Sequence, residues 1–306
     1  MGARLPTFSI IVPTFRRHRQ VVECIEALAR LDYPPELYQV IVVESDPSVE
    51  AETLKEFQKR IQLRILSQPP CGQAAARNLG AQAAEGEFLA FTDDDCRPVP
   101  GWLGSLVAQF AVTPDRAVGG PVRNLLTNDP YATLSQIVID CLYDWYNSDP
   151  NMPRYFGTNN LAVPNVPFKT LGGFDSSFRP AGEDRDFCAR WLEHGYQMAF
   201  SPEAVVWHAH AMTLATFWQQ HFNYGRGSFR FRLARTRVTG RALALEPFAF
   251  YRKVLSAPFS RLPRSAHMTR GLIELMLISQ VATAAGFLRQ ALELVKPAEE
   301  KTSASS

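Results

Sequence analysis

Short apolar runs alternate with longer amphipathic segments at the start of the chain. The apolar runs are rich in β-branched and aromatic residues, which predicts buried strands. They are Phe8–Val12, Val40–Val43, Leu63–Leu66 and Phe88–Phe91. The segments between them have helical spacing and composition. They are Arg17–Arg30, Glu50–Arg60 and Gln73–Ala84. Strands that alternate with helices form βαβ units, so we predict an α/β fold with a mostly parallel sheet flanked by helices.

Beyond Gly101 the pattern is less regular, and after about His208 it is only helical. Between these points the pattern predicts helices at Trp102–Phe110, Tyr131–Tyr146 and Gly182–His194 and strands at Ala117–Gly119 and Ala204–Trp207. Three later helices are predicted at Thr213–Arg235, Arg241–Leu255 and Met268–Val295, with Pro258 and Pro263 as breakers between the last two. We therefore expect an α/β domain over residues 1–221 and a helical region over residues 222–306.

The charge of the chain divides between the same two regions. The formal net charge of the 306 residues is only +2. Residues 1–221 carry 18 Lys and Arg against 25 Asp and Glu, a net charge of −7, whereas residues 222–306 carry 14 against 5, a net charge of +9. Such an asymmetry indicates that the two regions have different partners.

Composition and cysteine usage indicate a globular protein of a reducing compartment. The chain is 46% hydrophobic and 20% charged, as globular proteins are. Its five cysteines are scattered and form no C-x-x-C pair, which argues against a disulfide framework or a thiolate zinc site. The run Phe8–Val12 is too short for a secretory signal and is followed by Arg16 and Arg17. We expect a cytoplasmic location.

Polar residues follow three of the predicted strands, and ligands bind beyond the carboxyl ends of strands in open α/β sheets. These residues are Pro13, Thr14, Phe15 and Arg16, then Glu44, Ser45 and Asp46, then Asp93, Asp94 and Asp95. Carboxylates at one edge repel each other unless a cation lies among them. A few oxygen ligands that leave room for phosphate oxygens are typical of Mg²⁺ or Mn²⁺, so we expect a divalent metal here. N-capping of the next helix would need one aspartate and not three.

A second cluster consists of Gly172–Asp175 and Gly182–Asp186. Glu183 and Asp184 begin a predicted helix, where the helix dipole favours anions, and this alone would explain either acid. It does not explain the Gly-Gly-Phe-Asp turn before them. Farther along, His208 and His210 end a strand two residues apart, so at most one of them faces the site, and a purely structural role stays open for both.

In this order the motifs resemble those of the family 2 glycosyltransferases, which are inverting enzymes with the GT-A fold. Each motif alone is weak evidence for a family, but the ordered series of motifs is specific evidence. The series runs through Phe8–Arg17, Val42–Ser48, Ala74–Asn78, Gly86–Cys96, Gly172–Asp175, Gly182–Asp186 and His208. The resemblance implies a metal-dependent transfer from a nucleotide sugar, a UDP-sugar, to an acceptor hydroxyl in cell-surface glycan or glycolipid synthesis. The acceptor would be a glycan, a lipid-linked sugar or a small molecule.

The resemblance also implies roles for individual residues. The nucleotide pocket would contain Pro13, Thr14, Phe15, Arg16, Glu44, Asp46, Arg77, Asp93 and Asp94. The metal would be held by Asp95, Asp93 and His208, with His210 as the alternative to His208. Asp184 would be the general base, with Glu183 beside it.

The chain departs from the family pattern at several positions. Glu44 and Pro47 stand where the family usually has Asp and Gly, which leaves the nucleotide base open. The Q-x-x-R-W signature of processive synthases is missing, and Gln219–Tyr224 occupies a comparable place. The resemblance therefore favours transfer of a single sugar over polymerisation.

Two alternatives remain at this stage. A sugar-phosphate nucleotidyltransferase shares a similar core, but it needs a glycine-rich phosphate loop where this chain has Pro13–Arg17. A non-catalytic nucleotide-sugar-binding protein at a membrane surface is the other. The absence of G-x-G-x-x-G, Walker A and G-x-S-x-G motifs argues against dinucleotide oxidoreductases, ATPases and serine hydrolases.

The basic helical region predicts contact with an anionic membrane surface. Residues 222–289 contain 12 Lys and Arg against two acids, and aromatic residues lie between the arginines. Leu272–Leu288 is apolar but shorter than the ~20 residues of a membrane span. This combination is typical of a helix that lies on a membrane. Packing on the catalytic domain or a dimer contact is the alternative, and no nucleic-acid partner is expected.

Overall fold

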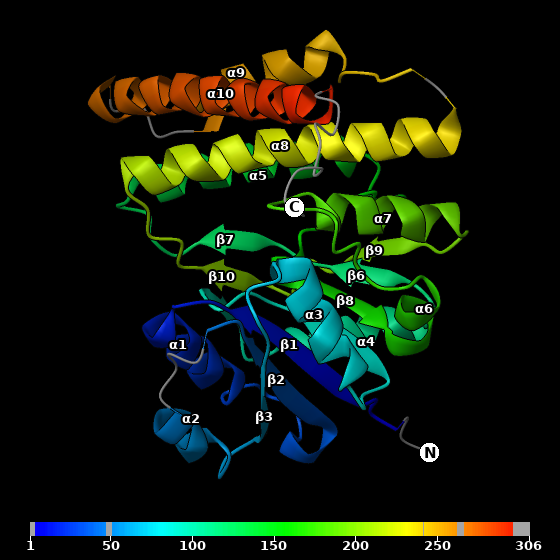
Figure 1. The fold of residues 1–306 in the computed structure, drawn as a ribbon. Coiled ribbons are helices and arrows are strands. Elements are labelled where there is room, and N and C mark those ends of the chain that lie inside the picture. Colours follow the sequence, from blue (N-terminus) through cyan, green and yellow to red (C-terminus); the bar gives the residue numbers. More distant parts are fainter. Residues whose placement is uncertain (1–3, 47–50, 241, 262–265, 296–306) are drawn as a thin grey trace, which may run out of the picture. The chain divides into compact units, whose positions relative to one another are not determined.

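The apolar runs near the start of the chain form the parallel strands β3-β2-β1-β4 of a seven-stranded sheet in the computed structural model (Figure 1). β1 (Phe8–Thr14) pairs with β2 (Tyr38–Glu44) and with β4 (Phe88–Phe91), and β3 (Gln62–Ser67) pairs with β2. All residues of β1, β2 and β4 are buried, as expected for a parallel sheet covered on both faces. The predicted fold class is confirmed.

Shorter strands complete the sheets. β8 (Leu161–Pro164) runs antiparallel between β4 and β6 (Ala117–Gly119), and β9 (Met198–Phe200) is parallel to β6. A second sheet consists of β5 (Cys96–Pro98), β10 (Val206–His208) and β7 (Val122–Asn124). The pattern predicted only β6 and β10 among these six strands, because three or four residues are too few to show an alternation.

Successive residues of β1 supply two hydrophobic cores, one on each face of the sheet. Ile10 and Val12 pack with residues of α1, and Ile11 packs with residues of α3 and α7. The helices of this part of the chain are α1 (His18–Leu28), α2 (Ala51–Phe57), α3 (Gln73–Gln82), α4 (Trp102–Val112), α5 (Pro130–Tyr146), α6 (Asn165–Thr170) and α7 (Glu183–Glu193). The predicted helices are confirmed, whereas α6 carries no predicted counterpart.

The chain divides into two units. Unit 1 consists of Met1–Ser177 and Glu183–Ala211, and unit 2 consists of Phe178–Gly182 and Met212–Ser306. Residue 221, where the sequence predicts the division, lies inside α8 (Leu214–Thr239) of unit 2. The structure describes residues 4–46, 51–240, 242–261 and 266–295, so Pro47 and Pro263 lie outside the described residues.

Unit 2 is helical, and its two long helices approach each other at glycines. Besides α8 it contains α9 (Phe248–Arg261) and α10 (Ala266–Val295). A Cβ atom on Gly225 of α8 would lie 1.9 Å from the Thr283 carbonyl oxygen, and one on Gly286 of α10 would lie 1.9 Å from the Phe222 oxygen. Only glycine allows the helix backbones to come this close.

Two expectations for the helical region need correction. Pro258 lies inside α9 and does not separate the last two helices, because a proline kinks a helix without always ending it. From Arg270 to Leu294, α10 is long and apolar enough to cross a membrane by length and composition, with a mean hydropathy of 1.6, so it is longer than the predicted apolar segment. A helix in the core of a globular protein can have the same length and composition, and 33% of this apolar stretch is buried.

Candidate active site

Three aspartates follow β4 and lie next to the end of β1. Thr14, the last residue of β1, is paired in register with Glu44 at the end of β2. Its hydroxyl donates a 2.8 Å hydrogen bond to Asp94 Oδ2. Asp94 and Asp95 are buried, whereas the Asp93 side chain keeps 26% of its surface exposed. The ends of β1, β2 and β4 therefore bring Thr14, Glu44 and the aspartates to one edge of the sheet.

Arg17, which precedes α1, is a counter-charge for two of these aspartates. Its Nη1 lies 3.1 Å from Asp94 Oδ1 and 2.9 Å from Asp95 Oδ2. Burial raises the pKa of Asp94 to about 6, although the Arg17 charge and the Thr14 hydrogen bond act in the opposite direction. The protein thus carries part of the positive charge that a row of carboxylates requires.

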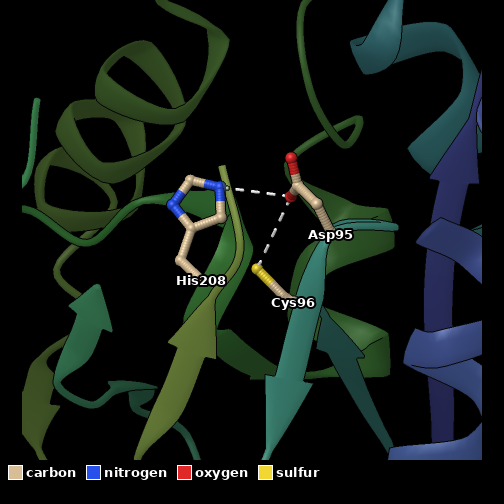
Figure 2. A group of neighbouring side chains, drawn as sticks. All are labelled: Asp95, Cys96 and His208. Atoms are coloured by element: carbon tan, nitrogen blue, oxygen red, sulfur yellow. Dashed lines mark hydrogen bonds and ion pairs between the residues drawn. The ribbon is translucent and has the colours of Figure 1, made fainter. Parts of the chain in front are cut away.

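The side chains of Asp95, directly before β5, of Cys96, at the start of β5, and of His208, at the end of β10, converge (Figure 2). His208 Nε2 lies 3.1 Å from Asp95 Oδ1, and Cys96 Sγ lies 4.0 Å from the same oxygen. The three potential ligand atoms all lie within 4.8 Å of one another. A carboxylate oxygen and an imidazole nitrogen at this spacing suit a divalent cation such as Mn²⁺ or Mg²⁺. The donor set therefore fits the metal that the sequence predicts.

The electrostatic environment distinguishes the two histidines. Burial raises the pKa of Asp95, but the charges of His208, His210 and Arg17 outweigh it, so this pKa lies below its ordinary value. Burial lowers the pKa of His208, and Asp95 outweighs this effect, so the net shift is upward. Burial and the neighbouring His208 charge lower the pKa of His210 to about 4. The structure pairs His208 and not His210 with Asp95.

Arg77, on α3, bridges two acidic segments that lie far apart in the sequence. Its Nη2 donates to Asp93 Oδ1 at 2.7 Å and its Nη1 donates to Glu183 Oε1 at 2.8 Å. The Arg77 side chain is only 1% exposed. Burial raises the pKa of Glu183 to about 7, against the lowering effect of the Arg77 charge. A single guanidinium therefore holds the aspartate cluster beside the start of α7.

Asp184, at the start of α7, has different partners from Glu183. The Tyr155 hydroxyl donates to Asp184 Oδ2 at 2.8 Å, and the Arg185 amide donates to Asp184 Oδ1 at 2.7 Å. Burial raises the pKa of Asp184, and these two hydrogen bonds partly offset that rise. Asp184 is therefore a carboxylate with a raised pKa and a neutral phenol as its side-chain partner.

The Gly-Gly-Phe-Asp turn is held by side chains from two helices. Asn78 Nδ2 donates to the Phe174 oxygen at 2.7 Å, and the Phe174 amide donates to Asn78 Oδ1 at 2.9 Å. Arg190 Nη2 donates to the Gly173 oxygen at 2.8 Å. Gly173 has a φ of +70°, and a Cβ there would lie 2.6 Å from Asn78 Oδ1, so the position requires glycine. This turn connects α3, which carries Arg77, to the region before α7.

The remaining predicted nucleotide residues lie at the ends of β1 and β2. Pro13 is buried opposite Val43, and Phe15 is 46% exposed. Arg16, with a φ of 55°, donates from Nε to Asp46 Oδ2 at 2.5 Å, and its guanidinium carbon lies 5.1 Å from the Phe15 ring centroid. The structure joins Arg16 to Asp46 and not to the three aspartates.

Three residues of the site were not predicted as functional. The position of Arg17 three residues after the end of β1 was a usable signal, as was that of Cys96 directly after Asp95. Tyr155 had no comparable signal, because its contact with Asp184 joins residues 29 positions apart.

The sequence is similar to a known protein family and to individual known proteins. Residues 9–178 match the sequence profile described as "Glycosyl transferase family 2", which is more than half of the chain. The glycosyltransferase AglE of Haloferax volcanii is 27% identical over 244 residues, which cover 75% of each chain. The pre-mycofactocin glycosyltransferase of Mycobacterium tuberculosis is 28% identical over 192 residues, which cover 61% of this chain and 41% of the relative. The chain thus spans less than half of the second relative.

Solved structures with the GT-A fold resemble this one over nearly the whole chain. The mannosyltransferase PcManGT of Pyrobaculum calidifontis, in complex with GDP-Man and Mn²⁺, superposes with a TM-score of 0.59 at 18% identity and covers 96% of this chain and 82% of its own. Residues 1–349 of TarS from S. aureus superpose with a TM-score of 0.51 at 15% identity and cover 95% of this chain and 92% of their own. At these identities the likeness concerns the fold.

The bridging position of Arg77 predicts that the folded chain loses stability when this residue is replaced. Replacing Arg77 with Met leaves Glu183 and Asp93 without their shared cation, so the free energy of unfolding falls by about 3–5 kcal/mol. Glu183 has a pKa of about 7 in the folded chain against an ordinary 4.5, so its contribution to stability is full below pH 4.5 and is lost as the pH rises towards 7. Without Arg77 this pKa rises further, so urea denaturation at pH 9 should show a larger loss than at pH 5.

The matched control is Arg64→Met, because Arg64 pairs with Glu85 on the surface, at 46% and 82% side-chain exposure. We expect it to cost less than about 1 kcal/mol at either pH. An Arg77→Met loss of equal size at pH 5 and pH 9 would contradict the assigned coupling to Glu183.

Proposed function

The chain belongs to the family 2 glycosyltransferases, an inverting family, and on that basis we propose that it transfers a single sugar from a UDP-sugar to an acceptor hydroxyl in a metal-dependent reaction. The observation that carries the proposal is the pair of Arg77 contacts, 2.7 Å to Asp93 and 2.8 Å to Glu183. They bring the proposed donor side and the proposed base side of the reaction together. Reactants held in a fixed orientation react faster because the entropic cost of alignment is met in advance. Family membership also favours transfer over the nucleotidyltransferase alternative.

The donor side is proposed from the ends of β1 and β2. The exposed Phe15 ring, with the Arg16 guanidinium 5.1 Å from its centroid, offers a surface on which a nucleotide base stacks. Thr14, Glu44 and Asp46 surround the same strand ends. Solved relatives of the fold were determined with UDP-GlcNAc in TarS and with GDP-Man in PcManGT. A nucleoside diphosphate sugar is thus the common donor class, and we assign UDP within it.

The metal is assigned to Asp95, His208 and Asp93. Asp95 and His208 supply a carboxylate oxygen and an imidazole nitrogen 3.1 Å apart. A bound divalent cation would act as a Lewis acid that stabilises charge on the leaving diphosphate. Arg17 and Arg77 hold the three aspartates against mutual repulsion at the same place.

Asp184 is assigned as the general base. As the acceptor oxygen attacks the anomeric carbon, its proton passes to the Asp184 carboxylate. The bond from the anomeric carbon to the diphosphate oxygen breaks, and the nucleoside diphosphate leaves with the electron pair. Proton removal by a positioned carboxylate contributes about 10²–10⁴-fold in rate. The raised pKa of Asp184 suits this role, because a more basic carboxylate accepts the proton more readily.

Replacing Asp184 with Asn tests the base. We expect kcat to fall by about 10²–10⁴-fold, while the Kd for the UDP-sugar with Mn²⁺ stays within twofold, because the amide keeps the shape but accepts no proton. Calorimetric titration and single-turnover transfer give the two values. Asp115→Asn, at an exposed residue, is the control and should leave both unchanged. Near-normal turnover of Asp184→Asn would contradict the assignment of Asp184 as the general base.

Replacing Asp95 with Ala tests the metal and the nucleotide. A thermal-shift panel of UDP-, GDP- and dTDP-sugars with and without Mn²⁺ should show, for the unaltered protein, the largest stabilisation with a UDP-sugar plus Mn²⁺. Asp95→Ala should lose the increment due to Mn²⁺. An increment that persists in Asp95→Ala would contradict the metal ligand, and a larger shift with a GDP-sugar would replace UDP by GDP.

Unit 2 is proposed to dock on the anionic cytoplasmic face of a membrane, where a lipid-linked or cell-surface glycan acceptor is available. On α10, Leu277, Val281 and Leu288 are 55%, 58% and 62% exposed, and they follow one another at intervals that share a helix face. Arg226 and Arg232 are paired with Glu293 and Glu246 inside unit 2. The apolar stripe of α10 and the net positive charge of the region would supply the contact.

Vesicle sedimentation tests this proposal. We expect the protein to pellet with vesicles of phosphatidylcholine and phosphatidylglycerol at low salt, and the double variant Val281→Asp, Leu288→Asp to stay in the supernatant. The double variant Val112→Asp, Val166→Asp adds the same charge at exposed positions of unit 1, 73% and 75% accessible, and should still pellet. Unaltered protein that remains in the supernatant would refute membrane docking.

A further inference from the structure

Tyr155 lies where it can control the carboxylate of Asp184. Its hydroxyl donates the 2.8 Å hydrogen bond to Asp184 Oδ2. The Asp184 Oδ1 atom accepts from the Arg185 amide of the same helix. The phenol is therefore the side-chain group that fixes the rotation of the carboxylate and leaves its other lone pairs in a defined direction.

The position of Tyr155 is itself held by several neighbours. Asn147 Nδ2 donates to the backbone carbonyl oxygen of Tyr155 at 2.8 Å, and the backbone amide of Tyr155 donates to Asn147 Oδ1 at 3.0 Å. The Tyr155 ring meets the rings of Tyr143 and Tyr146 edge to face, at centroid distances of 5.7 and 5.9 Å. Edge-to-face aromatic pairs have a preferred geometry. Backbone and ring are thus both restrained, and the hydroxyl is aimed before any substrate binds.

We propose that Tyr155 is a positioning residue for sugar transfer, which orients the Asp184 carboxylate and stabilises its charged form. This inference rests on the proposed role of Asp184 as general base. The hydrogen bond from a neutral donor to a carboxylate stabilises the charged form. A charged donor in the same place would do so more strongly but would also make the carboxylate a weaker base.

Several groups around Asp184 raise or lower its pKa, and the Tyr155 phenol acts against those that raise it. Burial is the largest influence and raises the pKa of Asp184, and Glu183 is a second acid beside it. Arg77 and Arg185 lower it by their charges. Tyr143 and Cys188 are close, but burial raises the pKa of each, so both remain neutral at physiological pH. Tyr155 itself has a pKa well above its ordinary value, mainly through burial, so it donates throughout the working range.

The pH dependence of Tyr155→Phe tests the inference. Without the hydroxyl, the Asp184 carboxyl gains a proton at a higher pH, so the acidic limb of the kcat profile moves upward by about 1–2 pH units. The rate at pH 7 falls accordingly and recovers in part at higher pH. The Kd for UDP-sugar and Mn²⁺ stays unchanged, because Tyr155 contacts the base and not the proposed donor residues.

Tyr143→Phe is the matched control. The Tyr143 hydroxyl accepts from the Gly157 amide at 2.9 Å, and its ring packs against the Tyr155 ring. Its removal should lower the melting temperature and leave the acidic limb where it was. Replacement of Tyr155 by 3-fluorotyrosine, which is a stronger hydrogen-bond donor of nearly the same shape, should move the limb to lower pH, and it serves also if Tyr155→Phe fails to fold.

The outcomes separate this inference from the proposed function. If Asp184→Asn turns over normally, the base assignment fails. If Asp184→Asn is inactive while neither Tyr155 variant moves the acidic limb, the base stands and the role of Tyr155 is overturned. A limb that moves equally in Tyr143→Phe would also overturn it, because the shift would then be structural.

Discussion

The site depends on one guanidinium that is almost completely buried. Arg77 reaches Asp93 with one nitrogen and Glu183 with another, across 106 positions of sequence. Buried carboxylates without a partner are costly, and two acidic segments drawn together repel each other as well. With Arg77 between them, the aspartates after β4 and the start of α7 can share one place. Arg17 has a similar role, because it forms ion pairs with both Asp94 and Asp95.

These internal cations change what the acidic residues imply. The sequence predicts that a row of carboxylates requires a metal, whereas the folded chain also supplies Arg17 and Arg77 as counter-charges. The folded chain therefore supplies part of the charge balance itself, and the proposed task of a bound metal is to stabilise the leaving diphosphate. In the positive region of the chain, Arg226 and Arg232 are likewise paired with acids of unit 2, which leaves the net charge of +9 unchanged.

The sequence predicts those parts of the molecule whose signal is local. The four strands from Phe8 to Phe91 each contain at least three apolar residues, and their ends locate Thr14, Glu44 and Asp93–Asp95. Three-residue strands such as β7 are too short to show a period. Tyr155 could not be identified, because its role arises from a contact with Asp184 that only the folded chain creates. Most helix ends lie within four residues of the predicted ones, whereas α9 begins and ends six to seven residues later than predicted, and Pro258 lies inside it.

Glu183 and Asp184 are neighbours with different partners, and the difference divides their roles. Burial raises the pKa of both. Glu183 Oε1 accepts a hydrogen bond from the Arg77 guanidinium at 2.8 Å, so this carboxylate is one side of the bridge to Asp93. Asp184 faces a phenol, which orders the carboxylate without supplying a full positive charge. Of the two adjacent acids at the start of α7, Glu183 is therefore bonded to a charged side chain and Asp184 to a neutral one, which supports the proposed assignment of Asp184 as the base.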